Sequence, residues 1–189
     1  MRLTVIGIGL MGGSLALTMR KKGLVSKVIG VDTNIEHQQL AKDLGIVDEI
    51  LSLEEAIKAS DVIVIATPIN VAENLLPTIL NLVHQQVVFD LGSTKESIVK
   101  LAQSHIKKGR FVPTHPMWGT EFSGPAAAKE DAFGDKATII CNKEHERDKY
   151  DKWIEWQKYN KIEDEYMSFY FYKWGSELTD DEDRKSTRL

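Results

Sequence analysis

A glycine-rich turn directly after an apolar segment is the feature that most constrains the fold of this chain. Residues 3–6 read LTVI, typical of a short buried strand, and residues 7–14 read GIGLMGGS at the start of an apolar-periodic helix. Gly7 permits a tight strand-to-helix turn, Gly9 leaves room for a phosphate near the backbone, and Gly12 allows close packing of the helix. Free N–H groups and the helix dipole favour an anion there. The turn therefore predicts a dinucleotide site, with Leu10 and Met11 among its contacts.

An acidic residue at the end of the next apolar segment extends this pattern. Residues 27–32 read KVIGVD, so Asp32 ends a predicted second strand twenty residues after Gly12. A carboxylate at that place accepts hydrogen bonds from both ribose hydroxyls of an adenosine and repels a 2′-phosphate, which favours NAD over NADP. Other nucleotide sites fit less well, because a GxxxxGK[ST] loop is absent and Met11 departs from the GxGxG pattern of methyltransferases.

Length and composition limit what else the chain can be. Its 189 residues allow one domain of about 150 residues with an appendage. The formal net charge of −4 argues against a nucleic-acid partner. The single cysteine, Cys141, excludes an internal disulfide, and we expect it to be a buried small side chain. Without a signal region or an apolar run of about 18 residues, we expect a soluble, cytoplasmic protein that does not bind a membrane.

Strands and helices alternate along the chain in the order of a doubly wound, mostly parallel sheet. The predicted helices cover residues 34–44, 53–58, 70–84 and 94–107, and Pro77 should kink or split the third. The later predicted strands cover residues 61–66, 86–90, 110–114 and 136–141. The sequence thus predicts a Rossmann-like α/β domain over residues 1–143, with six or seven strands in its sheet.

Two further motifs follow predicted strands, where doubly wound sheets bind their ligands. Residues 90–95, DLGSTK, enter a helix that could meet an anion, although Ser93 or Thr94 could equally cap that helix. Residues 115–125, HPMWGTEFSGP, begin with His115, the type of side chain best suited to accept a proton near neutral pH. We expect the other histidines to be solvated: His37, His84, His105 and His145.

These three motifs together resemble the prephenate and arogenate dehydrogenase family of tyrosine biosynthesis, and HPMWGTEFSGP is the most specific of them. The resemblance covers residues 1–143. It implies an NAD-dependent oxidoreductase that converts prephenate to 4-hydroxyphenylpyruvate by oxidative decarboxylation. It also implies that His115 accepts the proton of the ring hydroxyl, that Ser93 orients His115 and touches the substrate, and that Glu121 helps to gate or shape the pocket.

The same resemblance implies the cofactor contacts, which are Gly7, Gly9, Gly12, Asp32, Thr67 and Pro68. The substrate is then a small molecule, prephenate or arogenate, and no metal is implied. The resemblance leaves the oligomeric state open, with a homodimer as one possibility. Loss of a hydride from the carbinol carbon of prephenate makes a dienone, and its aromatisation expels carbon dioxide. The protein must therefore align the nicotinamide, withdraw the hydroxyl proton and hold both carboxylates.

Residues 144–189 depart from the family, whose members continue into a mostly helical second domain. Here a short tail contains all five tyrosines within residues 150–174. We expect residues 151–160 to form an amphipathic helix, residues 166–174 an exposed aromatic patch and residues 180–189 a disordered charged end. Three explanations stay open: a truncated or frame-altered gene product, an intact variant whose tail pairs with another chain, and a divergent protein.

Alternatives to full dehydrogenase activity also stay open. Apart from lysines and arginines on presumed surface helices, no cation is placed to pair with the carboxylates of prephenate, so we expect weak activity with cofactor binding retained. An NAD-binding module without turnover is one alternative. A β-hydroxyacid dehydrogenase is another, because its GxGxMG turn resembles residues 7–12, although that family would not predict the HPMWGTE loop. The contacts that separate prephenate from arogenate belong largely to the second domain.

Overall fold

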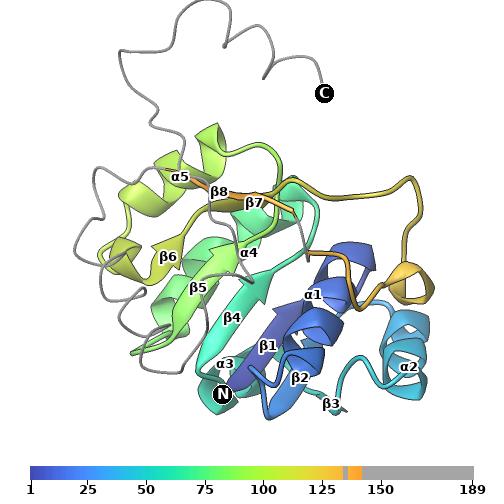
Figure 1. The fold of residues 1–189 in the computed structure, drawn as a ribbon. Helices are drawn as coiled ribbons and strands as arrows, with labels where there is room; N and C mark the ends of the chain where they lie inside the picture. Colours follow the sequence, from blue (N-terminus) through green and yellow to red (C-terminus); the bar gives the residue numbers. More distant parts are fainter. Residues whose placement is uncertain (134–135, 142–189) are drawn as a thin grey trace, which may run out of the picture.

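A parallel sheet lies at the centre of the computed structural model, which describes residues 1–133 and 136–141 (Figure 1). Its strands run in the order β3-β2-β1-β4-β5-β6, and every neighbouring pair is parallel. The strands are β1 (Arg2–Ile6), β2 (Lys27–Val31), β3 (Glu49–Ile50), β4 (Val62–Ile65), β5 (Val87–Asp90) and β6 (Phe111–Val112). This order confirms the predicted Rossmann-like fold. Its direction reverses between β1 and β4, where such sheets bind ligands at the carboxyl ends of their strands.

Helices cover both faces of this sheet. They are α1 (Leu10–Lys21), α2 (Ile35–Asp43), α3 (Leu53–Ala59), α4 (Ile69–Leu82) and α5 (Glu96–Gln103), with two short 3-10 helices, η1 (Lys108–Arg110) and η2 (Pro125–Ala127). In β4, Val62 and Val64 join the apolar cluster of α1 and α2, whereas Ile63 and Ile65 join that of α3, α4 and α5. Since successive side chains of a strand point to opposite faces, this explains why β4 is apolar throughout.

Local capping signals define the ends of the short helices. The side chain of Asn34 accepts hydrogen bonds from the backbone N–H groups of Glu36 and His37 at the start of α2. Ser52 and Glu55 form a reciprocal capping box at the start of α3. Both helices were predicted from the sequence within one or two residues of these bounds.

The last two predicted strands, residues 110–114 and 136–141, differ from the expectation. The segment 110–114 is not one strand, because β6 ends at Val112 and β7 (Thr114–Pro116) leaves the main sheet. Strand β7 pairs antiparallel with β8 (Thr138–Ile140) in a separate two-stranded sheet. Pro113 lies at the break and has no N–H to donate to a ladder. The prediction that residues 136–141 complete the main sheet was therefore wrong, and the unpredicted β3 is its sixth strand.

Two helices also differ from prediction. Helix α4 contains Pro77 and runs unbroken from Ile69 to Leu82, so a split at Pro77 was wrong. Proline in a helix interior costs about 3 kcal/mol, whereas burying a Leu or Ile side chain contributes about 1.5–3 kcal/mol. The fully buried side chains around the proline offset its cost: Leu76, Ile79 and Leu80. Helix α5 is shorter than predicted, and neither Ser93 nor Thr94 caps it, since its N-cap is Lys95 without a side-chain hydrogen bond.

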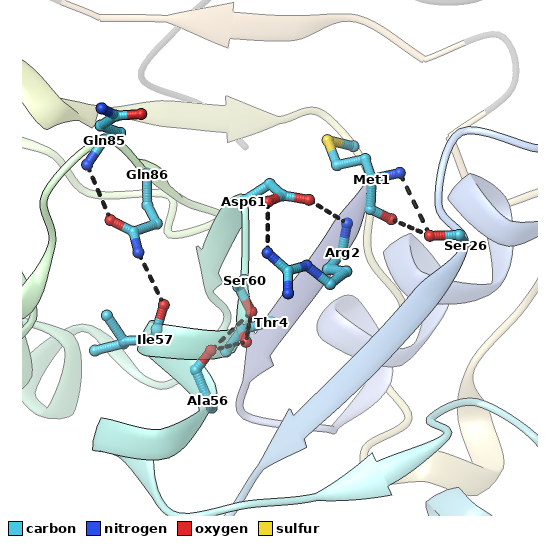
Figure 2. A network of polar contacts seen from close by, with 10 residues as sticks. All are labelled: Met1, Arg2, Thr4, Ser26, Ala56, Ile57, Ser60, Asp61, Gln85 and Gln86. Carbon is cyan, nitrogen blue, oxygen red and sulfur yellow. Dashed lines mark hydrogen bonds and ion pairs between the residues drawn. The ribbon is translucent and has the colours of Figure 1, made fainter.

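A polar network ties β1 to the segment before β4 at the amino ends of these strands (Figure 2). The carboxylate of Asp61 accepts a hydrogen bond from the backbone N–H of Arg2 at 2.8 Å and forms an ion pair with its guanidinium at 3.1 Å. The buried hydroxyls of Thr4 and Ser60 contact each other and both donate to the carbonyl of Ala56, at 3.1 and 2.8 Å. This edge is opposite the carboxyl ends of the strands, so we read the network as structural.

The C-terminal predictions lie outside the described residues. They concern the domain boundary at residue 143, the helix 151–160, the aromatic patch 166–174 and the charged end 180–189. Cys141, the last described residue, is half-buried, and burial raises the pKa of its thiol. Among the described helices, none has the length and apolar character that a membrane crossing requires.

Candidate dinucleotide site

Three glycines shape the turn between β1 and α1. Gly7 has a φ of +92°, and a Cβ atom there would lie 2.8 Å from the carbonyl oxygen of Ala66. A Cβ atom on Gly12 would lie 2.2 Å from the carbonyl oxygen of Gly7, so the close approach of the helix to the turn requires glycine. At Gly9, by contrast, a Cβ atom would meet nothing within 4 Å. The backbone at Gly9 is thus open to an approaching group.

The turn lines a cleft of about 1110 Å³. Every predicted cofactor contact except Gly12 lines it, namely Gly7, Gly9, Leu10, Met11, Asp32, Thr67 and Pro68. Gly12 is buried beneath the turn. The other walls come from the segment between β3 and α3, from the first turn of α2, from α4, from residues 91–92 of the DLGSTK turn, and from residues 122–124 of the HPMWGTEFSGP loop. The structure therefore brings the predicted contacts together around one cavity.

Asp32 follows β2 and holds the turn in place. Its carboxylate accepts backbone hydrogen bonds from Ile8 and from Asn34, each at 2.9 Å. The side chain is 12% exposed and lines the cleft. Because a carboxylate has about four lone-pair sites, acceptor capacity is left for a ligand hydroxyl. A negative charge at this point also disfavours a phosphate group.

Thr67 provides a test of whether the cleft fits a ligand. Its hydroxyl oxygen is buried and has no hydrogen-bond partner among the described residues. Leaving a buried hydroxyl unpaired costs about 1–3 kcal/mol, and a polar ligand atom in the cleft would remove that cost. Together with the open backbone at Gly9 and the carboxylate of Asp32, this hydroxyl makes the cleft fit a dinucleotide such as NAD.

A buried ion pair closes the DLGSTK turn, and its carboxylate also reaches the strand that carries His115. Asp90 is 1% exposed at the end of β5, and its carboxylate pairs with the ammonium group of Lys95. It also accepts backbone hydrogen bonds from Gly92 at 3.1 Å and from Thr114 at 3.2 Å. Burial raises the pKa of Asp90, and Lys95 with these N–H groups opposes that shift. Since Thr114 precedes His115, Asp90 fixes the start of the strand that carries the histidine.

His115 lies in the middle of β7, opposite Ile139 of β8. Burial and the charge of Lys95 lower the pKa of its imidazole, and Asp90 opposes them. The neutral imidazole that results is the form able to accept a proton.

The predicted partners of His115 make no hydrogen bond to it among the described residues. Both of them, Ser93 and Glu121, are exposed. None of these three residues lines the cleft. Their assigned roles stay predictions, while the structure surrounds His115 with the charges of Asp90 and Lys95 instead.

Sequence reasoning missed His37 and Lys95. His37 was expected to be solvated, but it lines the cleft with its Nδ1 atom 3.8 Å from Oδ2 of Asp32. Its position in the first turn of α2, directly after the acid-bearing strand, is the signal that could have identified it. Lys95 was given no role of its own, although its side chain is only 11% exposed and pairs with Asp90.

Comparison with known proteins tests the resemblance. Residues 15–158 match the family described as "Prephenate dehydrogenase, nucleotide-binding domain", which is more than half of the chain. The chain belongs to this family. It is 34% identical over 138 residues to the prephenate dehydrogenase of Bacillus subtilis (strain 168), covering 71% of this chain and 37% of that protein. It is 32% identical over 149 residues to that of Lactococcus lactis subsp. cremoris, covering 77% and 42%. The chain therefore spans well under two thirds of these relatives.

Solved structures agree with the family and the fold. A prephenate dehydrogenase from Aquifex aeolicus, in complex with hydroxyphenyl propionate and NAD+, superposes with a TM-score of 0.77 at 26% identity. The superposition covers 91% of this chain and 59% of that one. Arogenate dehydrogenase from Synechocystis has a TM-score of 0.75 at 22% identity, covering 92% and 60%, and shows likeness of fold alone. This nucleotide-binding domain thus has the Rossmann-like architecture of its family.

Proposed function

We propose that this domain binds NAD in its cleft and serves a dehydrogenase that oxidises prephenate or arogenate with loss of carbon dioxide. The observation that carries the proposal is that His115, whose pKa is lowered by burial and by the charge of Lys95, lies on the segment that continues into the outer wall of the cleft at residues 122–124. Oxidation of an alcohol needs a proton acceptor close to the cofactor. The loop that follows His115 connects this histidine to one wall of the cleft. Membership of the prephenate dehydrogenase family supports the choice of substrate.

Different residues around the cleft would bind different parts of the cofactor. The N–H groups at the start of α1, beside the open backbone of Gly9, suit the pyrophosphate. The carboxylate of Asp32 suits the adenosine ribose, and the unpaired hydroxyl of Thr67 suits a polar atom further along the cofactor. When bound, NAD supplies the hydride acceptor.

In this proposal His115 is the side chain that accepts the substrate proton. An imidazole nitrogen accepts the proton of the ring hydroxyl while the carbinol C–H bond gives up its hydride, which makes a dienone. Loss of carbon dioxide from the dienone leaves a phenolate that takes up a proton, and aromatisation drives this step. Lys95 helps by keeping the imidazole neutral, and Asp90 helps by holding Thr114 in place.

We expect the isolated chain to bind NAD but to turn over slowly. The buried cation next to His115 is Lys95, and its charge is already paired with Asp90. A carboxylate left half-paired at a closed site costs several kcal/mol, and each 1.4 kcal/mol lost from the transition state lowers the rate about tenfold. A turnover of about 1–10³ s⁻¹ with prephenate would contradict this expectation.

A nucleotide-binding module without turnover is the second candidate. One observation favours it, namely that none of His115, Ser93 and Glu121 lines the cleft. This candidate has the same cofactor site as the first. It differs because no side chain accepts a proton from a substrate.

A coupled assay distinguishes the two candidates. NADH formation is followed after addition of prephenate or arogenate to the purified chain, beside a calorimetric titration with NAD. His115→Asn is the test variant, and we expect it to lower any kcat by about 10²–10⁴ while NAD affinity stays near its original value. His84→Asn, the same change at an exposed position outside the cleft, is the control and should change neither quantity. Parallel loss of NAD binding in His115→Asn would show that the histidine supports the fold and not the reaction.

A further inference from the structure

The loop after His115, residues 117–130, is fixed at both of its ends (Figure 1). At the first end, the N–H of Met117 extends the pairing of β7 with β8 and donates to the carbonyl of Ala137 at 2.8 Å. At the second end, η2 packs beside α1 and α2. The ring of Trp118 contacts that of Phe133, with centroids 5.4 Å apart, so the two ends also hold each other. The middle of the loop is therefore held in one place beside the cleft.

The last residues of the GIGLMGGS motif form the seat of this loop on α1. A Cβ atom on Gly13 would lie 2.9 Å from the Cβ atom of Ala128, so this close approach requires glycine. The hydroxyl of Ser14, which is fully buried, accepts a hydrogen bond from the N–H of Lys129 at 2.9 Å. One motif thus provides both the glycine-rich turn of the cleft and the seat of the loop.

Two exposed apolar side chains line the cleft from different walls. Phe122 of the loop is 62% exposed, and Val71 in the first turn of α4 is 38% exposed. Among the exposed large hydrophobic side chains of the described residues, these are the two that line the cleft. Helix α4 packs on one face of the sheet, whereas α1 and α2, beside which the loop passes, pack on the other. A flat apolar group between these walls would bury both side chains.

We propose that Phe122 is a cofactor-binding residue whose ring stacks on the adenine of a bound dinucleotide, with Val71 against the opposite face of the base. The proposal rests on the proposed NAD site and adds to it a contact from outside the glycine-rich turn and the strand that ends at Asp32. Stacking of a base on an aromatic side chain is favourable, and burial of the exposed Phe122 ring adds to it. The contact would also connect the adenine to the segment that carries His115.

Phe122 lies toward the adenosine end of the cleft. Gly124, two residues further along the loop, passes beside α2, because a Cβ atom there would lie 3.6 Å from Nε2 of His37. The Nδ1 atom of His37 is in turn 3.8 Å from the carboxylate of Asp32, where we expect the adenosine ribose. The segment after β3, which neighbours β2 in the sheet, adds apolar side chains to the lining. The adenine is therefore the part of the dinucleotide that would meet Phe122.

Calorimetric titration with NAD and with ADP-ribose, which has the adenosine half but lacks the nicotinamide, tests the proposal. We expect Phe122→Ala to raise both Kd values by the same factor, about tenfold. Phe122→Tyr keeps an aromatic face and should leave both values within about threefold of the original. Met117→Ala shortens another exposed apolar side chain of the same loop, outside the cleft. It is the matched control and should bind both ligands as the unmodified chain does.

Val71→Ala tests the opposite wall independently, should Phe122→Ala fail to fold. It removes two methyl groups from the proposed contact, and we expect both Kd values to rise about threefold. Unchanged values in Val71→Ala would overturn the placement of the base between the two walls.

Three results would overturn the role of Phe122 while NAD binding stands. They are an unchanged NAD Kd in Phe122→Ala, a rise for NAD without one for ADP-ribose, and a loss in Phe122→Tyr as large as that in Phe122→Ala. Absence of binding of both ligands by the unmodified chain would overturn the proposed function, and the role of Phe122 with it.

Discussion

The carboxylate of Asp32 holds the glycine-rich turn and also faces the cleft. Its hydrogen bonds to the N–H groups of Ile8 and Asn34 form without a ligand and hold the glycine-rich turn against the start of α2. The remaining lone pairs face the cleft, where we expect a ribose. Replacement of Asp32 should therefore affect both the shape of the turn and the choice of cofactor.

The surroundings of His115 favour its neutral form. Burial and the charge of Lys95 lower its pKa, so its imidazole should take up a proton below about pH 6.5, the value for an unperturbed histidine. NMR titration of the imidazole signals, assigned by comparison with His115→Asn, measures this midpoint without any need for activity. A midpoint at or above about 6.5 would mean that the surroundings of His115 do not favour the neutral base.

The lowered pKa of His115 also makes the free energy of unfolding depend on pH. Because the folded His115 binds a proton less readily than the unfolded one, the unfolded state holds more protons between the two pKa values. The contribution of this group to the free energy of unfolding is thus complete above about pH 6.5 and falls as the pH drops toward the folded pKa.

At the scale of elements, the junction of β1 and α1 combines a packing glycine with a binding glycine. Gly12→Ala would place a Cβ atom 2.2 Å from the carbonyl oxygen of Gly7, and such overpacking costs about 1–3 kcal/mol or more. Gly9→Ala meets no atom within 4 Å, so its free energy of unfolding should stay within about 0.5 kcal/mol of the original. Gly9→Ala should instead weaken NAD binding, because its methyl group occupies the open face of the turn.

Urea unfolding of both variants, with calorimetric titration of NAD, checks this pair. Each variant is the control for the other, since both add one methyl group to the same turn. Unchanged stability of Gly12→Ala would contradict the close packing of α1 on the turn. Unchanged NAD affinity of Gly9→Ala would place the pyrophosphate elsewhere.

Elements with strong local signals were predictable from the sequence, and those set by distant contacts were not. The turn at Gly7 and the helix after Asn34 depend on a few neighbouring residues. Strand β3 has two residues, too few to show a pattern, and the break at Pro113 depends on pairing with β8. In the site, Asp32 belongs to a local motif. The contact of Asp90 with Thr114 joins residues 24 positions apart, which composition and spacing do not reveal.

On the scale of the whole molecule, the loop after His115 returns to the other end of the domain (Figure 1). It is anchored on α1, where Ser14 accepts a hydrogen bond from the N–H of Lys129 at 2.9 Å and Thr18 donates to the carbonyl of Glu130 at 2.8 Å. Between these anchors and His115, residues 122–124 line the cleft. A ligand in the cleft therefore contacts the segment that carries the proposed base.

Amide hydrogen exchange, measured with and without NAD, tests whether a ligand in the cleft affects the loop after His115. We expect NAD to slow exchange at residues 117–130 as well as at the glycine-rich turn, because a ligand in the cleft orders both of its walls. The network at the opposite edge, around Arg2 and Asp61, serves as an internal control and should exchange as before. Protection confined to the turn would show that the loop does not respond to the cofactor.

Every role proposed for the site depends on selection of NAD by the cleft between β1, β2 and β4. Calorimetric titration of the unmodified chain with NAD and with NADP at about pH 8 tests it most directly, with Asp32→Ala measured alongside. We expect one site for NAD, a Kd for NADP at least about tenfold higher, and a clear loss of that preference in Asp32→Ala. Equal affinity of the unmodified chain for the two dinucleotides would contradict it.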